Sequence, residues 1–123
     1  MSGLSAYGEA AVLAPLITNA YVSLHTADPG NTGASEVTGD PAYARQGPVA
    51  FTEAPSNPTV ASNSAIITYP AATALWGTIS FFGVWDAATG GNFRGSGAVT
   101  TPKSVNTGDT ARFAANSLTI TAQ

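Results

Sequence analysis

The 123-residue chain contains no cysteine and few charged residues. Without cysteine the protein has neither disulfides nor thiolate metal sites, so packing, backbone pairing or association must hold the fold together. Only 9% of the residues are charged, against about 25% in an average soluble protein. A surface with few charges loses little desolvation free energy when it packs against another protein. The composition favours a protein that binds other proteins, with an ordinary low-charge secreted domain as the alternative.

The scattered basic residues and the lack of a long apolar run each argue against one class of partner. The formal net charge is −3, and the four basic residues, Arg45, Arg94, Lys103 and Arg112, are scattered along the chain. Sequence neighbours therefore form no phosphate-binding patch, and we expect no nucleic-acid partner. No apolar run approaches the roughly 18 residues of a membrane span, and the N-terminus lacks the features of a signal peptide. We expect no membrane partner and synthesis in the cytoplasm.

Alternating apolar residues and frequent turns predict an all-β fold. The period of two begins at Ala20, and 13 glycines and 8 prolines supply turn positions. About seven short strands are expected, forming a compact antiparallel β-sandwich or small barrel. The length suits a single domain over residues 1–123, with a docking segment at 1–19 and a β-domain at 20–123.

A short helix is expected at the N-terminus. Over Ser2–Ile17, apolar residues such as Leu4 and Tyr7 recur at helical spacing, and Pro15 would end or kink the helix. An isolated helix of this length is marginal in water. Leu4 and Tyr7 are therefore candidates for contact with another subunit.

The segment Trp76–Asp86 carries the strongest strand pattern and is expected to be a central strand. Strict alternation places Phe81 and Trp85 on one face, and Phe82 and Val84 on the other. We assign Phe81 and Trp85 to the core. Phe82 then becomes a candidate for a subunit contact.

The long polar loop over residues 27–42 is the candidate interaction site, because long loops in small proteins are usually functional. Asp28, Asn31, Glu36 and Asp40 supply oxygen atoms that suit a hard cation such as Ca²⁺. Their spacing matches no EF-hand. Turn chemistry accounts for the same residues, because Asp and Asn side chains cap turns by accepting hydrogen bonds from their own backbone.

Two further side chains have alternative interpretations. His25, beside Asp28 in sequence, could belong to a catalytic group, but the chain lacks the G-x-S-x-G segment that would place a nucleophile. His25 is instead expected to donate a hydrogen bond to a backbone carbonyl and so fix the start of the loop. Arg45 is either a solvated charge or an interface residue. Its expected interface partners are Asp40, Glu53 and Asp86.

Three blocks of the sequence resemble small structural proteins of tailed bacteriophages. They are SLHTADPG…TG…E followed by YARQ, then WGTISFFGVWDAATGG within a longer middle segment, and finally GDTARF near the C-terminus. Proteins of this kind are described as tail-fibre-like, minor tail or head-decoration proteins. The resemblance implies a virion component made in the host bacterium. No catalytic residue is attributed to the family, so we expect neither enzymatic activity nor a cofactor.

Within that class, capsid decoration is the first expectation, because a small domain without fibrous repeats suits a lattice-bound cement protein. The alternative is a tail-fibre, tail-tip or adaptor component. A second alternative is a carbohydrate-binding module that stacks sugars on aromatic rings. The expected partners are the major capsid protein or tail proteins, with homo-oligomers, including trimers, implied by the resemblance. The candidate interface residues are Leu4, Tyr7, Asp28, Asn31, Glu36, Asp40, Arg45 and Phe82.

Overall fold

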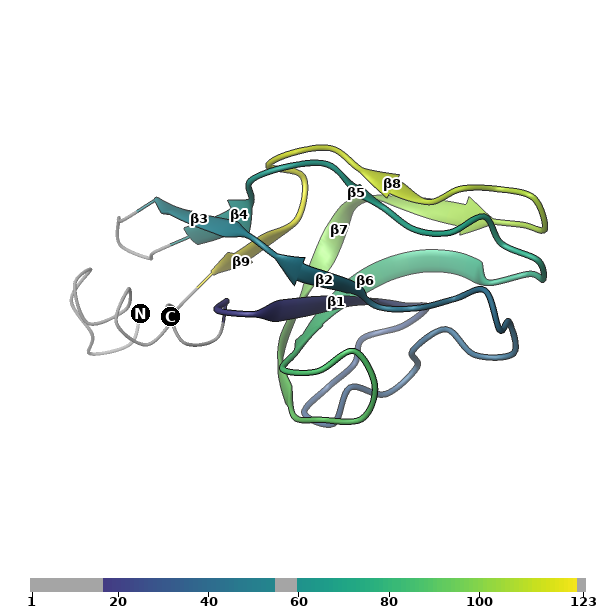
Figure 1. Cartoon of the computed structure of the whole chain (residues 1–123), viewed down its shortest axis with the longest axis horizontal. Helices are drawn as coiled ribbons and strands as arrows, with labels where there is room; N and C mark the ends of the chain where they lie inside the picture. Colours follow the sequence, from purple (N-terminus) through teal and green to yellow (C-terminus); the bar gives the residue numbers. More distant parts are fainter. Residues whose placement is uncertain (1–16, 55–59, 122–123) are drawn as a thin grey trace.

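The chain folds into antiparallel β-sheets (Figure 1). The computed structural model describes residues 17–54 and 60–121, and these ranges contain no helix. The all-β prediction is confirmed. The expected helix over Ser2–Ile17, with Leu4 and Tyr7, lies outside the described residues except for its last position. The strands are β1 (Ala20–His25), β2 (Gln46–Val49), β3 (Phe51–Ala54), β4 (Val60–Asn63), β5 (Ile67–Thr68), β6 (Gly77–Trp85), β7 (Phe93–Val105), β8 (Arg112–Phe113) and β9 (Thr119–Thr121).

The strands form a four-stranded sheet and two smaller ones. The larger sheet has the order β2-β1-β6-β7, and the smaller sheets have the orders β3-β4-β9 and β5-β8. β6 is therefore an interior strand, as predicted from its apolar content. It pairs with β1 from Tyr21 opposite Trp85 to His25 opposite Phe81. This pairing brings together segments that are far apart in the chain.

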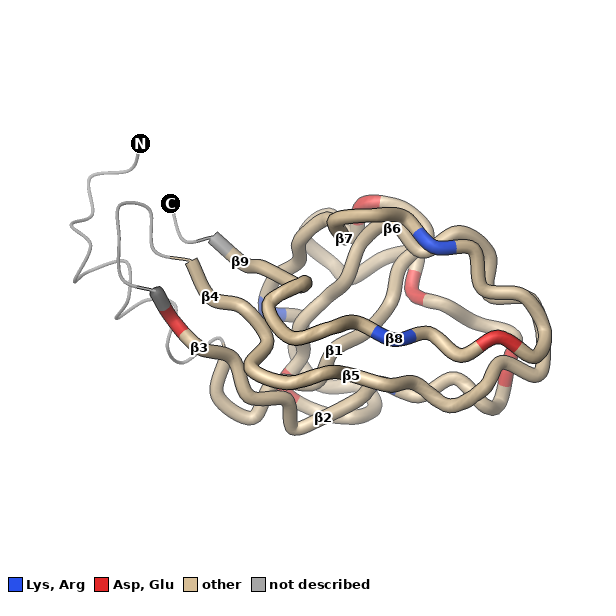
Figure 2. The backbone as a smooth tube through the Cα atoms, turned by 90° about the horizontal axis from the view of Figure 1, so that it is seen from above, with Lys and Arg blue, Asp and Glu red and all other residues tan. Residues whose placement is uncertain are grey.

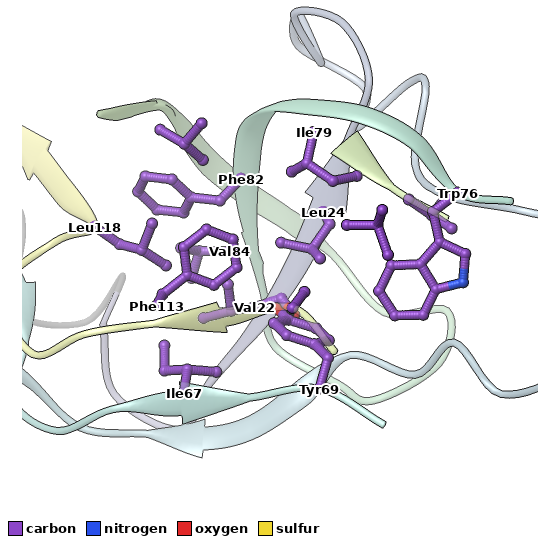
Figure 3. Packing of buried hydrophobic residues seen from close by; sticks show 14 of the residues in the cluster. Val22, Leu24, Ile67, Tyr69, Trp76, Ile79, Phe82, Val84, Phe113 and Leu118 are labelled. Carbon is purple, nitrogen blue, oxygen red and sulfur yellow. Dashed lines mark hydrogen bonds between the residues drawn. The ribbon is translucent and has the colours of Figure 1, made fainter. Parts of the chain in front are cut away.

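The hydrophobic core lies between one face of the four-stranded sheet and the β5-β8 side of the molecule (Figure 3). Side chains from both sides meet there, and Tyr69 is the largest that is almost completely buried. Its hydroxyl donates to the Val22 carbonyl at 2.7 Å, so the polar end of the ring is satisfied inside the core. The labelled members in Figure 3 are Val22, Leu24, Ile67, Tyr69, Trp76, Ile79, Phe82, Val84, Phe113 and Leu118.

The face of β6 that enters the core changes partway along the strand, which corrects the predicted alternation. Ile79 has no exposed surface, but the next buried core residues are Phe82 and Val84, while Phe81 is only half-buried. The pairing of β6 with β7 is irregular between Ile79 and Phe81. Such an irregularity shifts the side of the sheet to which later residues point. Phe82 is therefore a core residue with 0% exposure and is not available as a subunit contact.

The corrected faces of β6 predict unequal effects of two neighbouring truncations. Phe82→Ala is expected to lower the free energy of unfolding by about 3 to 5 kcal/mol, because it leaves a cavity in the packed core. Phe81→Ala, at a half-buried position, is expected to cost clearly less. Urea denaturation of the two variants measures both values. A loss for Phe81→Ala that equals or exceeds that for Phe82→Ala would contradict the assigned faces.

Candidate functional site

The candidate loop, residues 27–42, folds back onto the four-stranded sheet. It forms a bridge in which Glu36 lies opposite His25, beyond the end of β2. Val37 N–H donates to the Leu24 carbonyl at 3.0 Å, and Thr26 N–H donates to the Ser35 carbonyl at 3.1 Å. The loop therefore continues the sheet along the edge of β1 and satisfies backbone groups that would otherwise lack partners.

A buried polar chain connects the outer face of the sheet to the loop. His25 Nδ1 lies 2.7 Å from the Ala34 carbonyl oxygen. A carbonyl can only accept, so Nδ1 carries the proton and Nε2 of the neutral ring is an acceptor. The Ser23 hydroxyl, 2.6 Å away, then donates to Nε2 and accepts from Trp85 Nε1–H at 2.8 Å. The side-chain polar groups of Ser23, His25 and Trp85 therefore all have hydrogen-bond partners.

The surroundings of His25 favour a structural role. Ser23 and His25 each have 0% exposure, so a substrate cannot reach the Ser23 hydroxyl. Asp28 is not a partner of His25, because both ring nitrogens pair with other groups, and the Asp28 carboxylate accepts from the Gly30 N–H at 2.9 Å. Burial lowers the pKa of His25 below its ordinary value of 6.5, against the opposing effect of the Ala34 hydrogen bond. The predicted role of His25, donation to a backbone carbonyl at the start of the loop, is confirmed.

Packing against aromatic rings holds the loop in the same place. Gly33 is buried and has a φ of +75°. A Cβ atom at this position would lie 2.7 Å from Trp85 Cη2 and 3.1 Å from Phe93 Cδ1. The Trp85 and Phe93 rings contact each other with centroids 5.2 Å apart. Only glycine allows the loop backbone to approach these rings so closely.

Arg45 is bound within the chain, so it is not a solvated charge, and its acidic partner is none of the three that were expected. Its guanidinium pairs with Glu36 through Nε and Nη2, each at 2.9 Å from a carboxylate oxygen, and lies 3.7 Å from the Trp85 ring centroid. Nη1 donates to the Ala87 and Gly90 carbonyls. The partner is thus Glu36, which the sequence reasoning did not pair with Arg45. Glu36 and Arg45 both lie in the blocks that resemble the phage proteins. This shared location is the feature of the sequence that could have suggested their pairing.

Glu36 also accepts a hydrogen bond from the Tyr43 hydroxyl at 2.8 Å. Burial opposes ionisation of Glu36, but the hydrogen bonds from Arg45 and Tyr43 outweigh it and lower its pKa below the ordinary 4.5. The same Tyr43 hydroxyl accepts from the Leu24 N–H at 3.0 Å. The pair is therefore coupled to β1 and acts as a fixed part of the fold.

Asp40 anchors the end of the loop. Its carboxylate accepts from the Ala42, Thr73 and Ala74 N–H groups at 2.9, 2.8 and 3.2 Å. It also accepts from the Thr73 hydroxyl and, at 2.6 Å, from Trp76 Nε1–H. These hydrogen bonds, that of the Thr73 hydroxyl above all, hold the pKa of Asp40 well below its ordinary 3.8. With 7% exposure, Asp40 is an internal residue and offers little surface to a partner.

The predicted interface residues of the loop therefore fall into two groups, one exposed and one bound within the fold. Asp28 and Asn31 are exposed at the loop tip, whereas Glu36 and Arg45 are half-buried and paired with each other. Of the four residues considered for Ca²⁺, Asp28, Glu36 and Asp40 accept hydrogen bonds from different parts of the chain. Across residues 17–54 and 60–121, no group of three or more His, Cys, Asp or Glu side chains is placed to hold a metal ion. In the same ranges no helix is long and apolar enough to cross a membrane.

Two glycine substitutions test whether the loop is packed as described. Gly30 and Gly33 both have positive φ, but a Cβ at Gly30 meets nothing within 4 Å. Each change to alanine is expected to cost about 1 to 2 kcal/mol from the left-handed backbone. Gly33→Ala should cost about 1 to 3 kcal/mol more, because it forces apart the Trp85 ring and the loop. Equal losses in thermal or urea unfolding would contradict the packing.

The buried His25 predicts a pH-dependent stability. Its folded-state pKa is lowered, so the unfolded chain binds the proton first as the pH falls. The free energy of unfolding is therefore expected to decrease as the pH drops from about 7.5 to about 5. His25→Asn should lower the stability at every pH but flatten its change in this range. Urea titrations at several pH values measure both slopes, and equal slopes would contradict the assignment.

Comparisons with known proteins assign the chain to a family. Residues 5–121 match the family model described as podophage GP4 fiber I protein gp80. No curated protein matches the chain. The match covers the loop, the β6 segment and the C-terminal block that carried the phage resemblance, and it supports a structural role in the phage virion. The chain belongs to the podophage GP4 fiber I protein gp80 family.

Proposed function

We propose that this protein is a structural subunit of a podophage fibre and has no enzymatic activity of its own. The observation that carries the proposal is the family match over residues 5–121. The description of the family names a fibre protein. The match therefore favours the fibre alternative over the capsid-decoration role that was first expected. The proposed partners are other fibre or tail proteins and further copies of this chain.

The proposed attachment surface is the loop tip, residues 28–32. Asp28, Asn31 and Thr32 are exposed there, while the rest of the loop is held by Gly33, Val37 and Asp40. A tip held on a fixed base loses little conformational entropy when it binds. Its uncharged amide and hydroxyl groups also cost less to desolvate than ions. The proposed mechanism is the burial of this polar surface, whose one charged side chain is Asp28, in many repeated contacts.

The distribution of aromatic rings disfavours a module that binds sugars by stacking. Across the described ranges every aromatic side chain is buried or half-buried, and Trp76 and Trp85 retain only 5% and 9% of their surface. Binding of neutral sugars by stacking needs accessible ring faces. A fibre subunit that docks to neighbouring proteins does not need them.

Labelling of intact particles tests the location. Gold-labelled antibodies raised against the purified protein are expected to mark the fibres of negatively stained phage particles. Particles from a phage that lacks the gene serve as the control for non-specific labelling. Label spread over the head surface would overturn the fibre proposal and support capsid decoration. Particles without label under conditions that mark a known virion protein would overturn both.

Charge introduced at the loop tip tests the attachment surface. Asn31→Arg combined with Thr32→Arg is expected to lower the amount of protein in purified particles roughly tenfold or more, because docking would bury unpaired charges. Thr107→Arg combined with Thr110→Arg, at exposed positions around another turn, is the matched control. Quantitative immunoblots measure incorporation, and urea denaturation verifies folding. Equal incorporation of folded tip and control variants would exclude the loop tip.

A further inference from the structure

An open groove of about 430 Å³ runs between β7 and the segment around and after β8. Thr101 and Lys103 line it from β7, and Arg112, Asn116 and Ser117 line it from the other side. Its volume lies within the roughly 300 to 1,000 Å³ that is typical of small-molecule sites. The groove is separate from the loop 27–42 and its buried network, because none of their residues line it.

Two of the four basic residues of the chain line this groove. Figure 2 shows a basic segment at β8 and the other charged positions, of both signs, spread over the described backbone. Of the four basic residues, Arg45 is bound by Glu36 and Arg94 donates to the Thr18 carbonyl at 2.7 Å. The other two, Lys103 and Arg112, both line the groove.

The two cations of the groove are available to a ligand. Both are exposed, and neither donates a hydrogen bond to another residue in the described ranges. The Lys103 ammonium lies 5.6 Å from the centroid of the Phe113 ring, which places the charge beside the groove floor. No Asp or Glu lines the groove. In a chain with a net charge of −3, this is a locally positive surface.

The uncharged lining adds hydrogen-bonding groups. Thr100, Thr101 and Ser117 contribute hydroxyls, and Asn116 contributes an amide. The Ser117 hydroxyl donates to the Ala114 carbonyl at 2.7 Å, which leaves its oxygen free to accept. Phe113 is only 3% exposed, so its ring offers little stacking surface. A ligand must therefore gain its affinity from ion pairs with the two cations and from hydrogen bonds with the hydroxyl and amide groups. A molecule with an anionic group and several hydroxyl groups fits this lining.

We propose that this groove binds an acidic saccharide, in which a carboxylate or phosphate group pairs with Arg112 and Lys103 while sugar hydroxyls contact the Thr, Asn and Ser side chains. Arg112 can bind a carboxylate or phosphate through two parallel hydrogen bonds, and Lys103 adds a second positive charge. A role of this site in attachment to host surface polysaccharide rests on the proposed fibre function. Binding of an acidic saccharide by the isolated chain does not depend on that function.

The test is an NMR titration of the isotope-labelled full chain with defined probes. Trigalacturonate and galactose 6-phosphate supply the two anions, and galactose is the neutral control. Both acidic probes are expected to shift the amide signals of residues 99–103 and 112–117, and higher salt should weaken the binding. The expected shifts with galactose are much smaller. No shift with either acidic probe at millimolar concentration, or equal shifts with galactose, would overturn the proposal.

Substitutions of the two cations test whether they bind the acidic probe. Arg112→Gln and Lys103→Gln are each expected to weaken trigalacturonate binding roughly tenfold, because each removes a hydrogen bond to a charged group. Arg94→Gln removes the same charge outside the groove and should have little effect. Equal weakening by all three variants would show a non-specific charge effect and overturn the site. Tighter binding of a hexaglutamate peptide would overturn the saccharide in favour of an acidic protein segment.

Discussion

The Asp40 carboxylate is the constraint on which the arrangement of the loop depends. It accepts hydrogen bonds from two parts of the chain that are more than 30 residues apart in sequence, the turn at Ala42 and the segment from Thr73 to Trp76. An ionised carboxylate with this many donors is stable at low exposure, although a buried charge without partners would be costly. Because Trp76 is also a core residue, one side chain connects the loop directly to the hydrophobic core.

With its end fixed at Asp40, the loop can cover the outer face of the four-stranded sheet. The face opposite the core carries Ser23, His25 and Trp85, whose polar groups need partners if they are to be buried. The loop supplies the Ala34 carbonyl to His25 and brings Gly33 against Trp85. Glu36 then holds Arg45 beside the same tryptophan. The loop is therefore anchored to the folded body, and its tip, residues 28–32, carries the exposed side chains of Asp28, Asn31 and Thr32.

Patterns that depend on neighbouring residues were predictable from the sequence. The strand at Ala20–His25, the interior position of β6 and the hydrogen bond from His25 to a backbone carbonyl were all anticipated. The faces of β6 were not, because alternation assumes an unbroken ladder, and the pairing shift between Ile79 and Phe81 depends on β7. The pairing of Glu36 with Arg45 and the contacts of Asp40 were missed for a related reason. Many turns and loops accept an acidic residue, and only the tertiary fold selects its partner.

Few charges are present, and the structure uses them in different ways. Asp40, Glu36 and Arg45 are held at low exposure, where salt screens them weakly. Much of the remaining surface is neutral and polar, so contacts made there depend little on ionic strength. Lys103 and Arg112 are exposed beside the groove, and any anion bound there is screened strongly. Ionic strength therefore separates the two kinds of recognition: docking through the loop tip, where Asp28 is the one charged side chain, should persist in salt that releases a ligand from the groove.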